Sequence, residues 1–189
     1  FNNEQIPSGI FRVGVTNDDD VTVATEYDVT EIDPDGDIMA NTTVPSTFCW
    51  MDAAAPNDGS DDAVLLDIFG PAIATWDSAA GTFDVIANNV GQSTNVLGTD
   101  DSGAYWAAST YGDRIEIVDA GGERSTLRLD TLGLNAYGIK ALETAGSHST
   151  FALYESNTGT GIVRIEANGT MEQVVVAEGG AYWQDMVRF

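Results

Sequence analysis

The chain has 189 residues, of which 43% are hydrophobic, so it carries enough apolar material to bury a core. Its 30 acidic residues against 7 basic ones give a formal net charge of -23. This negative field disfavours nucleic acid and anionic membranes as partners, and no apolar run is long enough to cross a membrane.

The surface chemistry indicates a salty environment outside the cytoplasm. Lys140 is the only lysine, and an acidic, lysine-poor surface is similar to that of proteins adapted to high salt, although an ordinary acidic extracellular protein is the alternative. The polar start FNNEQIPSG is no signal peptide. We therefore expect a mature extracellular or periplasmic chain, in which the lone Cys49 is a buried, inert thiol.

In chain order, short runs of apolar or alternating residues are separated by Gly, Asn and Asp, which is typical of an all-β protein. Four of these runs end in a tight turn that contains glycine. The turn glycines are Gly36, Gly81, Gly122 and Gly169, at intervals of 45, 41 and 47 residues. Such a period predicts a β-propeller of about four four-stranded blades, and a β-sandwich is the alternative.

The predicted blades form a single propeller domain, or propeller segment, over residues 1–189. They cover residues 21–54, 62–102, 103–146 and 149–189. Their innermost strands are expected at 22–28, 63–69, 104–110 and 150–156. Residues 8–15 are expected to form an extra outer strand that belongs to a preceding blade.

Two segments carry a resemblance to known propeller families. Residues 103–123 (GAYWAASTYGDRIEIVDAGGE) resemble the repeat of the NHL, SMP-30/gluconolactonase and YVTN group, and residues 151–175 resemble ScyD/ScyE-like repeats. Propellers of this group generally have six or more blades. The resemblance therefore implies that another chain, a second copy or a missing segment completes the ring, unless four blades close by themselves.

The candidate metal site follows from the repeat. Glu26, Asp67, Ser109 and Glu155 align at one position of the predicted inner strands, so they would converge around the propeller axis. Three carboxylates brought together there would repel one another unless a cation or shared protons neutralised them, and Asn157 could add a carbonyl ligand. SMP-30-like lactonases hold a divalent metal in this way, which implies Ca²⁺ or another divalent cation here. The alternative is that these acids lie in solvent at strand ends.

Other catalytic groups are scarce. His148 is the only histidine and lies in a predicted loop, and no nucleophile elbow accompanies it. The tryptophans Trp50, Trp76, Trp106 and Trp183 predict packing between blades, with carbohydrate stacking as the alternative.

The favoured function is therefore a non-catalytic binding or structural propeller that works outside the cytoplasm. Its expected partners are a protein or a second copy that completes the ring, with carbohydrate or a small molecule as further candidates. The alternative is a divalent-metal-dependent lactonase or hydrolase that uses Glu26, Asp67, Glu155 and Asn157.

Overall fold

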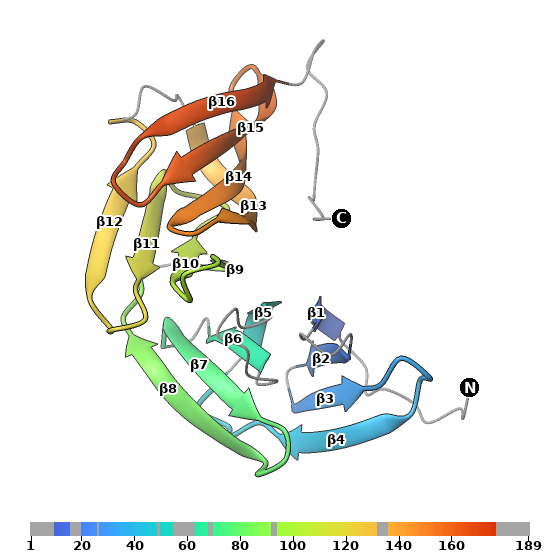
Figure 1. Cartoon of the computed structure of the whole chain (residues 1–189). Coiled ribbons are helices and arrows are strands. Elements are labelled where there is room, and N and C mark those ends of the chain that lie inside the picture. Colours follow the sequence, from blue (N-terminus) through green and yellow to red (C-terminus); the bar gives the residue numbers. More distant parts are fainter. Residues whose placement is uncertain are drawn as a thin grey trace. The chain divides into compact units, whose positions relative to one another are not determined.

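The computed structural model is all-β, and the predicted fold class is confirmed. It describes residues 10–15, 20–25, 27–48, 50–54, 63–67, 70–91, 94–131 and 136–176. These residues form 16 strands in four four-stranded antiparallel sheets (Figure 1). Within this part of the chain, no helix is long and apolar enough to cross a membrane. The chain divides into two compact units, Phe1–Val90 and Gly91–Phe189.

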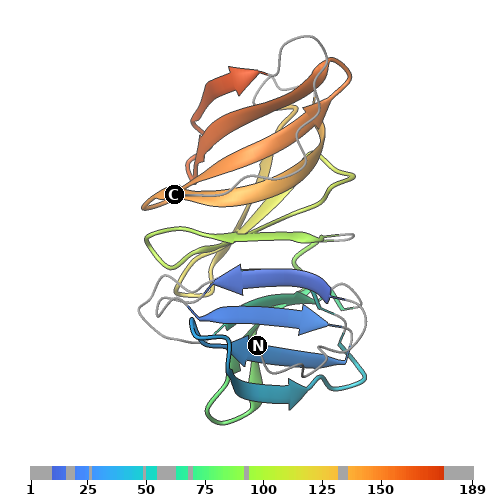
Figure 2. The same ribbon diagram turned by 90° about the vertical axis from the view of Figure 1, so that its right-hand side faces the viewer.

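The first unit holds two sheets, each built from consecutive strands. One contains β1 (Ile10–Val15), β2 (Val21–Thr25), β3 (Asp28–Ile32) and β4 (Ile38–Thr43). The other contains β5 (Trp50–Ala54), β6 (Ala63–Asp67), β7 (Ala72–Asp77) and β8 (Thr82–Asn88). Neighbouring strands of the first sheet, drawn in blue, alternate in direction (Figure 2). The two sheets meet at their first strands, β1 and β5.

The second unit repeats this plan. One sheet contains β9 (Val96–Thr99), β10 (Tyr105–Ala108), β11 (Arg114–Val118) and β12 (Arg124–Arg128). The other contains β13 (Ala136–Gly146), β14 (Ser149–Ser156), β15 (Gly159–Glu166) and β16 (Met171–Val176). These sheets also meet at their first strands, β9 and β13.

The four repeated turns are confirmed as the hairpins between the third and fourth strands of each sheet. Their glycines all have a positive φ: Gly36 (90°), Gly81 (66°), Gly122 (81°) and Gly169 (85°). In the third sheet, Gly122 donates its N–H to the carbonyl oxygen of Asp119 at 2.9 Å. The Asp119 carboxylate also accepts a hydrogen bond from the N–H of Glu123 at 2.8 Å. Glycine recurs at this place because a side chain disfavours a positive φ.

Each unit has its own apolar core between its two sheets. Trp76 lies in the core of the first unit and Trp106 in that of the second, both almost completely buried. The packing role predicted for these two tryptophans is therefore confirmed. Trp183 and Cys49 lie outside the described residues.

The predicted blade limits need a correction of one strand. Residues 8–15 were expected to be an outer strand of a preceding blade, but β1 is the first strand of the first sheet. Likewise, the segments predicted to be innermost, beginning with 22–28, contain the second strands β2, β6, β10 and β14. The reason is that a repeat in the sequence fixes the period and not the starting strand, since the loops between sheets are as short as some loops within them.

Candidate functional site

Strand β13 is irregular where it begins. Its pairing with β14 passes over Tyr137 and again over Lys140, so each is the extra residue of a β-bulge. A bulge interrupts the alternation of side chains between the two faces of a sheet and re-aims the side chain at that point. The directions of the Tyr137 and Lys140 side chains therefore depart from the regular alternation of a strand.

Both bulge residues reach the same carboxylate on the neighbouring strand. Lys140 Nζ lies 2.6 Å from Glu155 Oε2, and both side chains are partly exposed, at 23% and 19%. The hydrogen bond from Lys140 lowers the pKa of Glu155 below its ordinary value; the charge of Lys140 and a hydrogen bond from Tyr137 act in the same direction, while burial opposes them. Glu155 is therefore held as a carboxylate, and its charge is balanced locally by Lys140.

The loop between β10 and β11 lies against this part of β13. A Cβ atom added at Gly138 would be 2.1 Å from the carbonyl oxygen of Thr110, so only glycine fits there. Next to this contact, the N–H of Ile139 donates to the carbonyl oxygen of Ser109 at 2.9 Å. The side chain of Asn95 accepts from the N–H of Thr110 and donates to its hydroxyl, both at 2.8 Å. The loop is thus fixed on two sides.

Two exposed tyrosines flank this backbone contact, because Tyr111 follows Thr110 and Tyr137 precedes Gly138. Tyr111 is 86% exposed and Tyr137 is 44% exposed. We call the resulting group, with its aromatic rings and its ion pair, the tyrosine–lysine site. It consists of Tyr111, Tyr137, Lys140 and Glu155.

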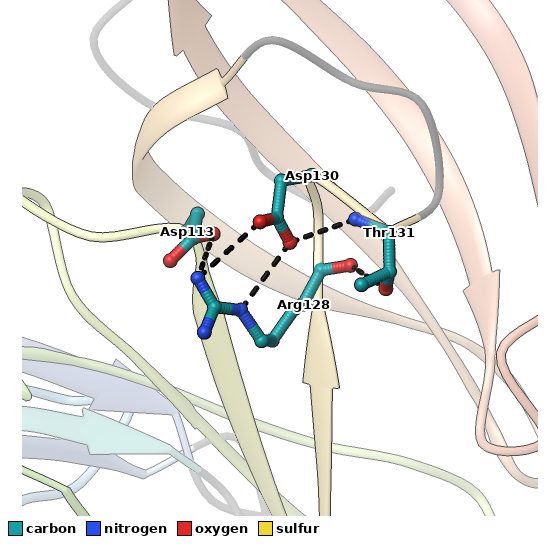
Figure 3. Close-up of polar contacts among 4 residues, drawn as sticks. All are labelled: Asp113, Arg128, Asp130 and Thr131. Atoms are coloured by element: carbon teal, nitrogen blue, oxygen red, sulfur yellow. Dashed lines mark hydrogen bonds and ion pairs between the residues drawn. The ribbon is translucent and has the colours of Figure 1, made fainter.

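The base of the same loop is closed by a charged cluster (Figure 3). Arg128 donates to Asp113 at 3.1 Å and to Asp130 at 3.3 Å, while the N–H of Leu129 donates to the carbonyl oxygen of Asp113 at 2.8 Å. The hydrogen bond to Asp113 raises the pKa of Arg128, and the charges of Asp113 and Asp130 act in the same direction. The cluster is exposed, so it contributes little to stability; it joins Asp113, at the end of the loop, to the residues that end β12.

The predicted metal ligands are only partly described. Glu26 lies outside the described residues. Asp67 ends β6, is 1% exposed, and accepts a hydrogen bond from the N–H of Gly70 at 3.2 Å. Asn157 is exposed in the turn between β14 and β15, and Ser109, which was aligned with the predicted ligands, is buried just after β10.

The strand pairing corrects the alignment that brought these residues together. In three sheets, the last paired residue of the second strand faces the residue just before a bulge of the first strand. These pairs are Thr25 with Ile10, Asp67 with Trp50, and Ser156 with Ala136. Asp67 therefore corresponds to Thr25 and Ser156, whereas Glu155 is displaced by one residue. A displacement of one residue in a strand turns the side chain to the other face.

The cation site consequently remains a prediction. Among the described residues, no group of three or more His, Cys, Asp or Glu side chains is placed to hold a metal ion. Asp67 belongs to the first unit, and Glu155 and Asn157 belong to the second. Glu155 is also already paired with Lys140.

His148 lies apart from the tyrosine–lysine site. It is an exposed turn residue with a φ of 58°, between β13 and β14. In the pairing of these strands, Gly146 faces Ser149 at the His148 end, whereas Gly138 faces Glu155 at the other end. The loop position predicted for His148 is confirmed.

Sequence reasoning found Glu155 but missed Tyr111, Tyr137 and Lys140. One signal was available, since Lys140 is the only lysine of the chain and its immediate neighbours in the strand, Ile139 and Ala141, are apolar. The bulges could not be inferred from the sequence, because an extra residue in a strand leaves no distinct pattern.

No family model matches the chain, and no curated protein matches it. Solved structures do. A structure of streptogramin B lyase has a TM-score of 0.70 at 16% identity over 94% of this chain and 58% of that one. A catalytically inactive histidine-to-alanine variant of virginiamycin B lyase from Staphylococcus aureus, with quinupristin, has a TM-score of 0.71 at 15% identity. The match covers 95% of this chain and 59% of that one. A protein of unknown function from Bacteroides caccae has a TM-score of 0.60 at 10% identity, and the match covers 87% of this chain and 60% of that one.

These similarities concern the fold alone, because the identities are low. The chain spans somewhat under two thirds of each of these proteins. The narrower resemblance to the NHL and SMP-30 group is not established by them. The chain is a protein of the β-propeller fold.

Proposed function

We propose that the chain is a non-catalytic binding propeller that works outside the cytoplasm in a salty environment and binds its ligand at the tyrosine–lysine site. One observation carries this proposal: two bulges of a single strand direct Tyr137 and Lys140 to the same carboxylate, Glu155. Bulges are over-represented next to functional sites, where they re-aim a side chain. Tyr111 belongs to the loop whose backbone contacts β13 at Gly138, and its exposed ring adds a contact surface.

The chemistry of the site supports binding over catalysis. A general base works best when its pKa lies near the working pH. The pKa of Glu155 is instead lowered by its hydrogen bond to Lys140, so this carboxylate is a weak base at neutral pH. His148, the only histidine of the chain, lies at the opposite end of the β13–β14 hairpin.

We further propose that additional blades complete the ring. The chain spans 58% of the streptogramin B lyase structure, so a ring of that size would need blades from a partner, a second copy or the rest of a longer protein. Native mass spectrometry of the material from its source tests this. A species at the 20.0 kDa mass of the chain alone would contradict ring completion.

A second candidate function is a divalent-metal-dependent lactonase or hydrolase that uses Glu26, Asp67, Glu155 and Asn157. The observation in its favour is the buried carboxylate of Asp67 at the end of β6. In such an enzyme, the cation would polarise the ester and a carboxylate would act as general base.

Thermal melting in calcium chloride and in sodium chloride of equal ionic strength separates the two functions. A binding propeller without a metal site should respond to ionic strength alone, so the two salts should raise the melting temperature equally. A saturable, calcium-specific rise at micromolar to low millimolar concentration, lost in Asp67→Asn, would instead support the metal enzyme. An assay with simple lactones and esters completes the comparison, because the binding propeller should hydrolyse none of them.

A further inference from the structure

The tyrosine–lysine site offers two aromatic rings on segments that are in backbone contact. Tyr111 is 86% exposed, and Tyr137 remains 44% exposed although its hydroxyl contacts Glu155. Exposed rings of this kind provide rigid apolar faces at a low cost in side-chain entropy. A ligand with a flat C–H face, such as a sugar ring, can stack on them.

The polar half of the site supplies donors and acceptors side by side. Lys140 carries three N–H donors and Glu155 two acceptor oxygens, and Nζ and Oε2 are 2.6 Å apart. Neighbouring hydroxyl groups, each of which donates and accepts, match such a pair. Since the two charges cancel locally, the site has no net charge with which to select an ion.

The negative charge of the whole chain disfavours anionic ligands and attracts cations without favouring any one site. A net charge of -23 repels phosphorylated, sulfated and uronic ligands. It attracts cations to the entire surface and not to this site in particular, and salt screens that attraction over about 10 Å or less. A neutral ligand held by stacking and hydrogen bonds avoids both effects.

We infer that the ligand of the tyrosine–lysine site is a neutral saccharide, stacked on Tyr111 and Tyr137 and hydrogen-bonded to Lys140 and Glu155. The inference rests on the proposed binding function and specifies its ligand class. It also requires that binding persist in strong salt, because neither stacking nor hydrogen bonding to a neutral ligand is screened.

The test is an NMR and calorimetric titration of the chain with neutral oligosaccharides, namely cellotetraose, maltotetraose, mannotriose and chitotriose. We expect at least one to bind with a millimolar or lower Kd, and this Kd to change less than about twofold between about 0.1 and 2 M NaCl. Tyr111→Ala should raise the Kd about tenfold, the loss typical of a well-stacked ring. Because Tyr111 is so exposed, this variant should fold normally.

Tyr27→Ala is the matched control. Tyr27 is 58% exposed in the equivalent loop of the first unit. Its N–H donates to Thr25 Oγ1 at 3.1 Å, as the N–H of Tyr111 donates to Ser109 Oγ at 3.1 Å. Removing Tyr27 should leave saccharide binding unchanged.

Spermidine serves as the cationic probe. If it binds, causes shifts at Tyr111 and Tyr137, and loses affinity in Tyr111→Ala while no saccharide binds, the saccharide inference is wrong and the binding function stands. If neither probe causes shifts at these residues, both are wrong. Saccharide binding that survives Tyr111→Ala, or falls equally in Tyr27→Ala, also overturns the inference.

Discussion

The buried carboxylate of Asp100 accepts a hydrogen bond of 2.9 Å from the indole Nε1 of Trp106. The other oxygen of this carboxylate accepts from the N–H groups of Ser102 and Ala104 in the turn between β9 and β10. Asp100 therefore ties the turn to the core of the second unit. Trp76, in the core of the first unit, has no hydrogen-bond partner for its Nε1 among the described residues.

This difference predicts unequal effects of the same substitution. Trp106→Phe removes ring volume and also leaves an oxygen of a buried carboxylate without its donor, whereas Trp76→Phe removes ring volume alone. A lost hydrogen bond to a charged group costs about 1.5–3 kcal/mol, so Trp106→Phe should lower the free energy of unfolding by about that much more. Urea denaturation of both variants measures the difference, and equal losses would contradict the role of Asp100.

A second prediction concerns the close approach of Gly138 and Thr110. Gly138→Ala places a methyl group 2.1 Å from a backbone carbonyl oxygen, so the loop between β10 and β11 must move away from β13. We expect a loss of about 2 kcal/mol or more, in the range of other overpacking substitutions, together with weaker ligand binding. Gly112→Ala is the control in the same loop, because its new Cβ would meet Ser109 Cβ at an ordinary 3.5 Å.

The fold was largely predictable because its signals are local. Each sheet has a turn that needs a positive φ, and glycine fills it in all four: Gly36, Gly81, Gly122 and Gly169. Glycine therefore recurs along the sequence at nearly regular intervals. No local signal indicates which strand begins each repeat. This depends on which short strand pairs with its neighbour, and β1 could be placed in the first sheet only once its pairing with β2 was known.

The site was much less predictable. Glu155 was identified as a candidate ligand because strands of similar composition align, but its contact with Lys140 depends on a bulge that shifts the pairing by one residue. The correspondence of Asp67 with Ser156, and not with Glu155, likewise becomes visible only from the strand pairing. The contact between Gly138 and Thr110 joins two different sheets, and no pattern within one repeat indicates it.

A third prediction follows from the lowered pKa of Glu155. A carboxyl group whose pKa is lower in the folded state stabilises the fold fully above its ordinary pKa, which is 4.5. This stabilisation is lost as the pH falls through the folded value. Glu155→Gln should therefore be less stable than the native chain at neutral pH, and the difference should shrink below about pH 4.5.

A double-mutant cycle with Lys140→Met assigns the effect to the ion pair. We expect a coupling energy of about 1 kcal/mol at pH 7 for a pair that is partly exposed to solvent. The coupling should decrease in acid, because protonated Glu155 no longer attracts Lys140. A coupling that is unchanged between pH 7 and pH 3 would show that packing of the side chains, and not their charge, stabilises this contact.

The fourth prediction concerns the acidity of the chain. With 30 acidic residues against 7 basic ones, repulsion between carboxylates should destabilise the fold at low ionic strength. Raising the ionic strength from about 0.01 to 1 M shortens the screening length from about 30 to 3 Å, so the melting temperature should rise steadily by several degrees. Sodium chloride and choline chloride should act equally, because screening does not depend on the cation.

A triple variant, Asp35→Asn, Glu123→Gln and Glu172→Gln, provides the matched test of this repulsion. All three side chains are exposed, and their replacement removes three negative charges without touching the core. The variant should melt at a higher temperature than the native chain in low salt, and the two should converge in strong salt as the repulsion is screened. If the variant is less stable at every salt concentration, these carboxylates stabilise the fold through contacts of their own, and repulsion does not limit its stability.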